Sequence, residues 1–397
     1  MAGIRTETPM QNNVLIRRVF AVVAIASGTV AYAQVPALSP SSTPSFSIRG
    51  FGTIGTAHSS IERGDFVANT RQSSGTGFSH EWAWGVDSKL GIQLDARLSE
   101  QFSAVVQVVS RQDPDNTYTP EAEWLNLKYQ PHPDFSIRAG RILLPTLMTA
   151  ESRLVDYANP WIRPPVETYS LVELTRSDGI DASYRRRIGN ATNTVQLLFG
   201  RQNEDLVLSL PYRTNVLEVR VRNLIGITNT IESGAWTMRA AAFTAKVSIG
   251  PVDGFSGGGR VNFYNLGAMR EGKRWFVQGE WTILNSQTKV RGASTQRRTA
   301  YYLSSGYRWG KLTPYAVYSW TGPTHGPPSP SSRSLQQKTV SAGVRWDVAR
   351  NVALKAQFDR IRLGRGGGGN GYFTNLQPGF PLAGSGNVVS VSANFIF

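Results

Sequence analysis

Hydrophobic and polar side chains alternate with a period of two along most of the chain after residue 45. Residues 89–98 alternate without interruption, so that Leu90 and Ile92 share one face while Gln93 and Asp95 share the other. The same alternation returns in many later segments, including the last one. A period of two places successive side chains on opposite faces of an extended strand. The pattern therefore predicts an all-β protein.

About sixteen segments show this pattern, each near the roughly 9–11 residues that a tilted strand needs to cross a bilayer. The predicted strands cover 46–57, 85–98, 101–112, 121–130, 134–143, 177–187, 191–201, 212–224, 235–249, 258–270, 273–287, 297–309, 311–321, 336–348, 351–364 and 386–397. Tight turns alternate with long connections rich in Gly, Pro and Ser. That asymmetry is typical of a transmembrane antiparallel β-barrel, whereas a soluble sandwich has no reason to place its long loops at one end.

The N-terminal residues resemble an export signal. Arg17 and Arg18 precede a short apolar stretch that ends in an A-x-A sequence at residue 33. This order is that of a secretory signal peptide, and about 12 apolar residues are too few to cross a membrane as a helix. The expected organisation is a signal peptide over 1–33, a flexible Pro- and Ser-rich linker over 34–45, and a transmembrane barrel over 46–397.

Composition narrows the chemistry. The 397 residues include no cysteine, which excludes disulfides, Cys-ligated metals and a cysteine nucleophile. Lys and Arg outnumber Asp and Glu by 42 to 27, a formal charge of +15. Because the basic residues are spread over many strands and loops, we expect no nucleic-acid partner. An anion-preferring lumen, or docking of anionic lipopolysaccharide at the rim, fits this distribution better.

A catalytic barrel is the alternative from another class. Nucleophilic hydrolysis needs a Ser or Asp beside an aligned His base. The four histidines are His58, His80, His132 and His325, and all fall in predicted loops or turns. Neither a His-Glu-x-x-His zinc pattern nor a P-loop is present. We therefore expect no enzyme activity, cofactor or metal. A non-conducting receptor or adhesin barrel and a barrel hydrolase remain the alternatives to an open channel.

Two short motifs stand in the first two predicted strands, SIRGFGTI over 47–54 and DSKLGI over 87–92. They resemble the first and second strands of the trimeric Gram-negative general porins. IRAGR over 137–141 resembles the Gly-Arg before their third loop, and Arg176 resembles the basic residue that opens the next strand. Their Pro-Glu-Phe-Gly-Gly loop signature is absent, and NPWIRPPVE stands at 159–167. The resemblance implies a divergent outer-membrane porin that assembles as a homotrimer.

A long segment over 144–176 is the candidate constriction. A barrel of about sixteen strands is too wide to be filled by its own side chains and leaves an aqueous channel. Loops of this length are usually functional or disordered, and the aromatic and proline residues here argue against disorder. We expect the segment to fold inward and narrow the channel, with an ordered external flap as the alternative.

Charges of both signs are expected beside this constriction. The predicted pore-lining basic residues are Arg49, Lys89, Arg141, Arg176, Arg308 and Arg345. The acidic residues of the loop are Glu151, Asp156, Glu167 and Glu173. Alternation within the strands places Arg49, Lys89, Arg308 and Arg345 in the lumen. The lumen positions of Arg141 and Arg176 are implied by the resemblance. For Arg141, alternation within its own strand instead predicts an outward side chain. Opposed rows of charge at a constriction can select solutes.

Together these features predict an outer-membrane porin for passive diffusion of small hydrophilic solutes and ions, with a preference for anions. The expected partners are outer-membrane lipids, lipopolysaccharide and two further copies of the chain.

Overall fold

A computed structural model describes residues 44–210, 213–252, 255–288, 296–325, 336–364 and 370–397. The predicted signal peptide over 1–33 and nearly all of the predicted linker over 34–45 lie outside the described residues. No helix among the described residues is long and apolar enough to cross a membrane.

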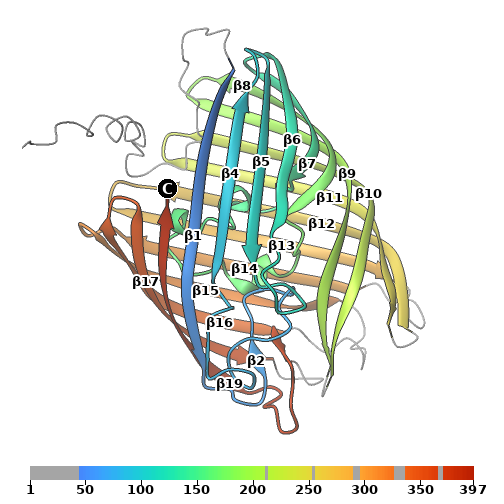
Figure 1. Ribbon diagram of the computed structural model, residues 1–397, viewed down its shortest axis with the longest axis vertical. Coiled ribbons are helices and arrows are strands. Elements are labelled where there is room, and N and C mark those ends of the chain that lie inside the picture. Colours follow the sequence, from blue (N-terminus) through green and yellow to red (C-terminus); the bar gives the residue numbers. More distant parts are fainter. Residues whose placement is uncertain (1–43, 211–212, 253–254, 289–295, 326–335, 365–369) are drawn as a thin grey trace, which may run out of the picture. The chain divides into compact units, whose positions relative to one another are not determined.

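Sixteen strands of nine residues or more make up most of the described chain (Figure 1). The first eight are β1 (Ser45–Ser59), β4 (Lys89–Arg97), β5 (Phe102–Arg111), β6 (Glu121–His132), β7 (Phe135–Leu143), β8 (Arg176–Ile188), β9 (Ala191–Leu210) and β10 (Arg213–Ser233). The others are β11 (Trp236–Val252), β12 (Phe255–Glu271), β13 (Trp275–Thr288), β14 (Gln296–Tyr307), β15 (Leu312–His325), β16 (Gln337–Ala349), β17 (Val352–Leu363) and β19 (Ser385–Ile396). Shorter elements are β2 (Asp65–Phe66), β3 (Trp82–Ala83), β18 (Phe373–Thr374), the 3-10 helices η1 (Ala150–Ser152) and η2 (Asp156–Ala158), and α1 (Val166–Tyr169).

The long strands close into an antiparallel barrel. Neighbours in the chain pair with each other, and β1 pairs with both β4 and β19. At this seam Gly50 and Phe397 exchange two backbone hydrogen bonds, of 2.8 and 3.0 Å. Closure removes the exposed edges that so wide a sheet would otherwise present. The predicted closed β-barrel of about sixteen strands is confirmed.

Aromatic residues near the C-terminus cover glycines of the first strand. A Cβ atom at Gly50 would lie 2.1 Å from Cζ of Phe397, and one at Gly52 would lie 2.4 Å from Cζ of Phe395. A side chain at either position would therefore force the facing ring to move. Glycine at these positions lets the aromatic rings lie directly across β1.

The two ends of the barrel differ. Tight turns follow β4, β6, β8 and β10, and those after β8 and β10 contain Gly189 and Gly234 at φ +58° and +57°, a region that glycine adopts readily. Long connections follow β1, β7 and β17. At the end with the long connections, β2 and β18 form a small separate sheet in which Phe66 contacts Phe373, with ring centroids 5.9 Å apart.

Several strands are longer than the sequence pattern predicts, and β9 shows the reason. β9 was expected to end at residue 201 but continues to Leu210, where it pairs with Arg213 of β10. The outward residues of this extension include Asn203 and Asp205, which are polar and exposed. The apolar alternation therefore ends before the hydrogen-bonded ladder does, and the predicted boundary was wrong for that reason.

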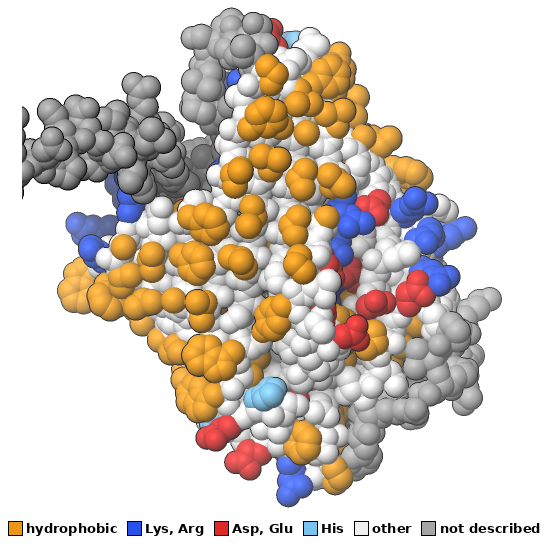
Figure 2. Space-filling model, in the orientation of Figure 1, with side chains coloured by type: hydrophobic (Ala, Val, Ile, Leu, Met, Phe, Trp, Pro, Cys, Tyr) orange, Lys and Arg blue, Asp and Glu red, His pale blue; other side chains and the backbone are white. Residues whose placement is uncertain are grey.

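The outer and inner faces have opposite chemistry. Figure 2 shows hydrophobic side chains gathered over β1, β4 and β5, and charged side chains gathered toward β9 and β10. Exposed aromatic residues near the tight-turn end include Trp275, Tyr307 and Trp309. The inner face instead buries polar groups such as Gln107 and Asn394. An apolar outside with aromatic residues near its border is the arrangement of a barrel in lipid.

Candidate functional site

Residues 144–175, between β7 and β8, pack against the inner wall of the barrel, and we call them the inner loop. Their hydrogen bonds and ion pairs reach inward-facing side chains of β1, β4, β11, β13, β15, β16 and β17. Regular structure in the loop is limited to η1, η2 and the single turn of α1. Side-chain contacts with the wall therefore determine its path.

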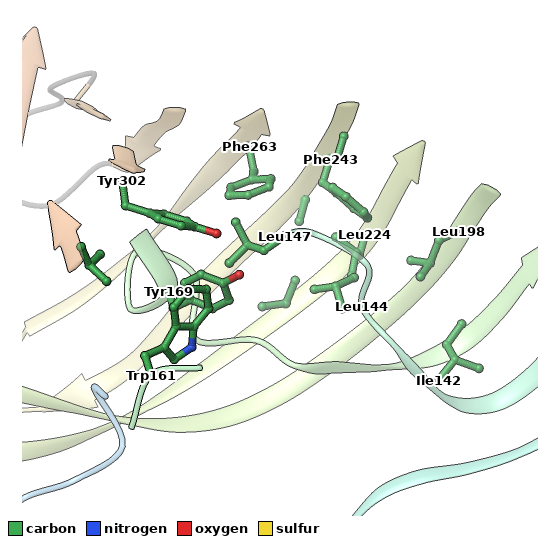
Figure 3. Close-up of a cluster of buried hydrophobic side chains, with 14 of the residues drawn as sticks. Ile142, Leu144, Leu147, Trp161, Tyr169, Leu198, Leu224, Phe243, Phe263 and Tyr302 are labelled. Carbon is green, nitrogen blue, oxygen red and sulfur yellow. The ribbon is translucent and has the colours of Figure 1, made fainter. Parts of the chain in front are cut away.

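An apolar cluster joins the inner loop to the strands. Leu147, Trp161 and Tyr169 of the loop pack with Phe263 and Tyr302 of the wall (Figure 3). The rings of Trp161 and Tyr302 meet edge to face, with centroids 6.2 Å apart. Such aromatic pairs contribute about 0.5–1.5 kcal/mol beyond the area they bury. This cluster holds the loop against the β12–β14 side of the barrel.

A buried carboxylate lies at the centre of that cluster. The hydroxyl groups of Tyr169 and Tyr302 both donate to Oε1 of Glu280, each at 2.8 Å, and the backbone N–H of Met148 donates to Oε2 at 2.9 Å. Burial raises the pKa of Tyr169, and the adjacent Glu280 raises it further, so the hydroxyl stays protonated and able to donate. Glu280 was not among the predicted site residues.

Asp156 and Lys89, both predicted site residues, form a direct ion pair. Nζ of Lys89 lies 2.9 Å from Oδ2 of Asp156, which also accepts a 2.8 Å hydrogen bond from Thr53. The Asp156 side chain is almost completely buried. The structure therefore brings these two residues together as a loop-to-wall contact, and not as opposite charges facing each other across water.

Two cations of the wall also bind backbone carbonyl oxygens of the loop, beginning at Asp156. Nζ of Lys355 donates to the carbonyl oxygens of Asp156, Asn159 and Trp161 at 2.6, 2.8 and 2.8 Å. Arg345, a predicted site residue, donates to the carbonyl oxygen of Asn159 at 3.1 Å. Lys355 is buried and was not predicted. Alternation places it on the inward face of β17, but nothing near it in the sequence identifies its partners.

Arg163 ties the loop to two further segments. Its Nε donates to Asp87 at 2.8 Å, and its Nη1 lies 3.0 Å from Asp359 of β17. The guanidinium also lies over the Phe66 ring, 5.2 Å from the centroid. Burial alone lowers the pKa of Arg163, but the two carboxylates more than offset this and raise it above its ordinary value. The group therefore remains charged.

The other acidic residues of the loop also serve as anchors. Glu167 accepts hydrogen bonds from Ser319 at 2.6 Å and Gln337 at 2.7 Å, and from Thr339. Glu173 pairs with Arg153 inside the loop at 2.9 Å.

Glu151 pairs with Arg239 of β11 at 3.1 Å, and Arg239 also donates to the Leu147 carbonyl oxygen at 2.7 Å. All four acidic residues predicted for the loop thus bind the wall or the loop itself.

Arg176 lies in a dense cluster of opposite charges. It pairs with Glu121 at 2.8 Å and with Glu123 at 3.0 Å, and it is buried. Arg71, from the connection after β1, pairs with Glu121 at 2.5 Å, and Arg111 pairs with Glu123 at 2.8 Å. The cluster therefore links the connection between β1 and β4 to the C-terminal end of the inner loop.

Arg141 faces away from the barrel interior. It pairs with Asp178 of β8 at 2.7 Å. Asp178 shares its face with the exposed Ile180, whereas Asp181, on the opposite face, is buried. The alternation within the strand therefore described Arg141 correctly, and the lumen position implied by the resemblance was wrong.

The remaining two predicted basic residues lie near the tight-turn end. Arg49 pairs with Asp95 at 2.6 Å and is largely exposed. Arg308 pairs with Glu271 and donates to the Gly272 carbonyl oxygen at 2.8 Å. Neither residue contacts the inner loop through a hydrogen bond or ion pair among the described residues.

A basic cluster that the sequence analysis missed lies on the inner wall of β6–β8. Arg138 pairs with Asp181 at 2.6 Å, and Lys128 stands directly opposite Arg138 in the strand register. Arg185 lies on the same face of β8 as Asp181. Lys128, Arg138 and Arg185 thus share this inner face with Asp181. The alternation of charged residues at inward positions of these strands could have identified this cluster from the sequence.

Comparison with known proteins shows which solved structures have a similar fold. No family model matches the sequence, and no characterised protein sequence matches it. The structure is similar to an anion-selective porin from Comamonas acidovorans, with a TM-score of 0.55 and 14% identity over 89% of this chain and 100% of that chain. The chain shares the barrel fold of this porin.

Two further outer-membrane proteins show the same likeness. The outer membrane channel DcaP of Acinetobacter baumannii has a TM-score of 0.58 and 11% identity over 91% of this chain and 100% of that one. The trimer form of OmpT, an outer membrane protein of Vibrio cholerae, has a TM-score of 0.55 and 10% identity over 89% and 100%. At sequence identities this low, the similarity shows a shared fold.

Proposed function

We propose that this protein is an outer-membrane porin that forms a water-filled channel for passive diffusion of small hydrophilic solutes and ions. The observation that carries the proposal is the inner loop, held against the inner wall of a sixteen-stranded barrel by contacts with seven strands. A barrel of this size leaves space that its own side chains do not fill. The loop narrows that space and sets the size of solute that passes.

The channel prefers anions. Lys128, Arg138 and Arg185 concentrate positive charge on the inner wall of β6–β8 around Asp181. Lys89 pairs with Asp156, Arg239 pairs with Glu151 and Arg153 pairs with Glu173, so three of the four acidic loop residues are matched by a cation. Glu167 accepts hydrogen bonds from the neutral side chains of Ser319, Gln337 and Thr339. Fixed charges act over roughly 8–10 Å near physiological salt, a distance comparable to the radius of a narrowed pore. The Comamonas protein of similar fold is described as an anion-selective porin.

The protein functions as a homotrimer in the bacterial outer membrane, in contact with membrane lipids. Apolar side chains such as Ile48, Leu90 and Ile92 are exposed on the outer faces of β1 and β4. They provide a surface for lipid or for a second copy of the chain. The Vibrio cholerae OmpT structure of similar fold is a trimer form. Electrophoresis without heating, followed by native mass spectrometry of the detergent complex, tests the trimer through its mass.

Swelling of proteoliposomes tests the channel itself. Vesicles containing the folded protein should swell in isosmotic solutions of small sugars, at rates that fall steeply as the sugar becomes larger. Vesicles containing heat-unfolded protein are the control. A folded protein that causes no swelling would support the alternative of a non-conducting receptor or adhesin barrel and would contradict the proposal.

A further inference from the structure

Two cations stand directly opposite each other on the outer wall, at the end of the barrel with the long connections. Lys338 of β16 pairs in register with Arg362 of β17, and both side chains are exposed. No ion pair links either to another described residue. Like charges directly opposite in a sheet are destabilising. The fold alone therefore gives no reason for this arrangement.

The chain supplies no nearby carboxylate in sequence to neutralise them. Residues 321–346 contain no Asp or Glu, and neither do residues 360–397. The two segments of these ranges that lie outside the described residues, 326–335 and 365–369, each contain an arginine and no acidic residue. An anion from outside the chain is the natural partner of this site.

A pocket of about 510 Å³ lies beside the two cations. Trp320, Lys338, Arg360, Arg362 and Ser385 are among its lining residues. Arg360 is held in place because it donates to Asn387 at 2.8 Å and to Ser385 at 2.9 Å. The pocket thus combines one oriented guanidinium with two cations that have no partner among the described residues.

The surroundings of the pocket place it at the border of the apolar band. The Trp320 ring stacks on Tyr301, with centroids 5.4 Å apart, and Trp and Tyr concentrate where a membrane meets water. Further along the same outward faces, Val340 and Phe358 are exposed and apolar. A ligand for this surface therefore carries acidic groups on a hydrophobic body.

We propose that this pocket binds the phosphorylated sugar headgroup of lipopolysaccharide, with a phosphate between Lys338 and Arg362 and acyl chains along Val340 and Phe358. The inference rests on the proposed outer-membrane function, in which the long connections face outward and this end of the barrel lies in the outer leaflet. A phosphate monoester suits a row of Arg and Lys because both donate charge-assisted hydrogen bonds. The pocket volume suits a phosphorylated sugar better than a lone phosphodiester.

Binding to the folded protein in detergent tests the site. Native mass spectrometry is used to titrate the protein with bisphosphorylated deep-rough lipopolysaccharide, with the same lipid after dephosphorylation, and with phosphatidylglycerol. The double variant Lys338→Gln/Arg362→Gln should bind the bisphosphorylated lipid about tenfold or more weakly, the loss expected when charge-assisted contacts are removed. The unmodified protein should discriminate against the other two lipids by a similar factor.

Lys246→Gln/Arg260→Gln is the matched control. These two residues also stand opposite each other and exposed on the outer wall, on β11 and β12, but they do not line this pocket. Equal losses in both double variants, an unchanged affinity in Lys338→Gln/Arg362→Gln, or equally tight binding of phosphatidylglycerol would each overturn the proposal. Because binding is read without current, a protein that binds the lipid but passes no ions would refute the channel and leave this site standing.

Discussion

Arg163 of the inner loop forms a buried ion pair with Asp87, the residue two positions before β4, with 2.8 Å between Nε and Oδ1. The same guanidinium reaches Asp359 of β17 at 3.0 Å. One side chain thus connects the loop to segments on both sides of the seam where β1 meets β19. The inner loop consequently stabilises the barrel and also lies in its lumen.

Replacing Arg163 by Gln should destabilise the folded barrel strongly. The substitution leaves Asp87 and Asp359 buried without their cation, a change that typically costs about 3–5 kcal/mol. Urea unfolding in lipid vesicles, followed by tryptophan fluorescence, measures the change. Arg49→Gln is the control, because the Arg49–Asp95 pair is exposed and should contribute about 1 kcal/mol or less. Similar losses in the two variants would contradict this role for Arg163.

Replacing Lys355 by Met should loosen the middle of the inner loop. The change removes the donor to three carbonyl oxygens between residues 156 and 161. Amide hydrogen exchange in this segment should become faster while exchange in the strands stays nearly unchanged. Lys338→Met, an exposed lysine on the neighbouring strand, should leave the exchange as it was. Unaltered exchange in Lys355→Met would show that other contacts hold the segment.

Deleting residues 150–168 should raise the single-channel conductance. The deletion removes Trp161, Arg163 and all but the last residue of α1, which occupy space along the inner wall. The variant is first checked for correct folding by the change in its electrophoretic mobility on heating. A correctly folded deletion with the conductance of the unmodified protein would show that the loop does not limit the pore.

Replacing Gly50 by Val should prevent normal closure of the barrel. The added Cβ would lie 2.1 Å from the Phe397 ring, far inside van der Waals contact. The yield of heat-modifiable folded protein should fall sharply, and the double variant Gly50→Val/Phe397→Ala should recover part of it. A normal yield from the single variant would mean that Phe397 rotates away at little cost.

Alternation was sufficient to predict the barrel because the environment of a strand residue depends on a local period. Leu90 and Ile92 face outward and Gln93 faces inward, as their order in the sequence indicates. The same rule assigned Arg141 to the outer face, where it pairs with Asp178. Where family resemblance and local period disagreed, the period was the better guide.

The loop contacts could not be predicted in the same way. Lys355 and Asp156 are 199 positions apart, and Arg163 and Asp359 are 196 apart. A sequence shows which residues are charged, but it does not show which of them the closed barrel brings together. The acidic loop residues were therefore expected to face water, whereas Asp156 and Glu173 are buried against Lys89 and Arg153.

The basic cluster on β6–β8 should control ion selectivity. Replacing Lys128 and Arg185 by Glu reverses the charge on the inner wall around Asp181. The reversal potential in a KCl gradient should then move toward that of K⁺, and the shift should shrink as salt rises, because ions screen the fixed charges. An unchanged potential would exclude this cluster as the source of selectivity.

The most direct test of the account is the single-channel current of the unmodified protein in a planar bilayer with KCl at different concentrations on its two sides. We predict discrete current steps and a reversal potential displaced toward the equilibrium potential of Cl⁻. Correctly folded protein that gives no current steps would contradict the channel, and a reversal potential displaced toward that of K⁺ would contradict the anion preference.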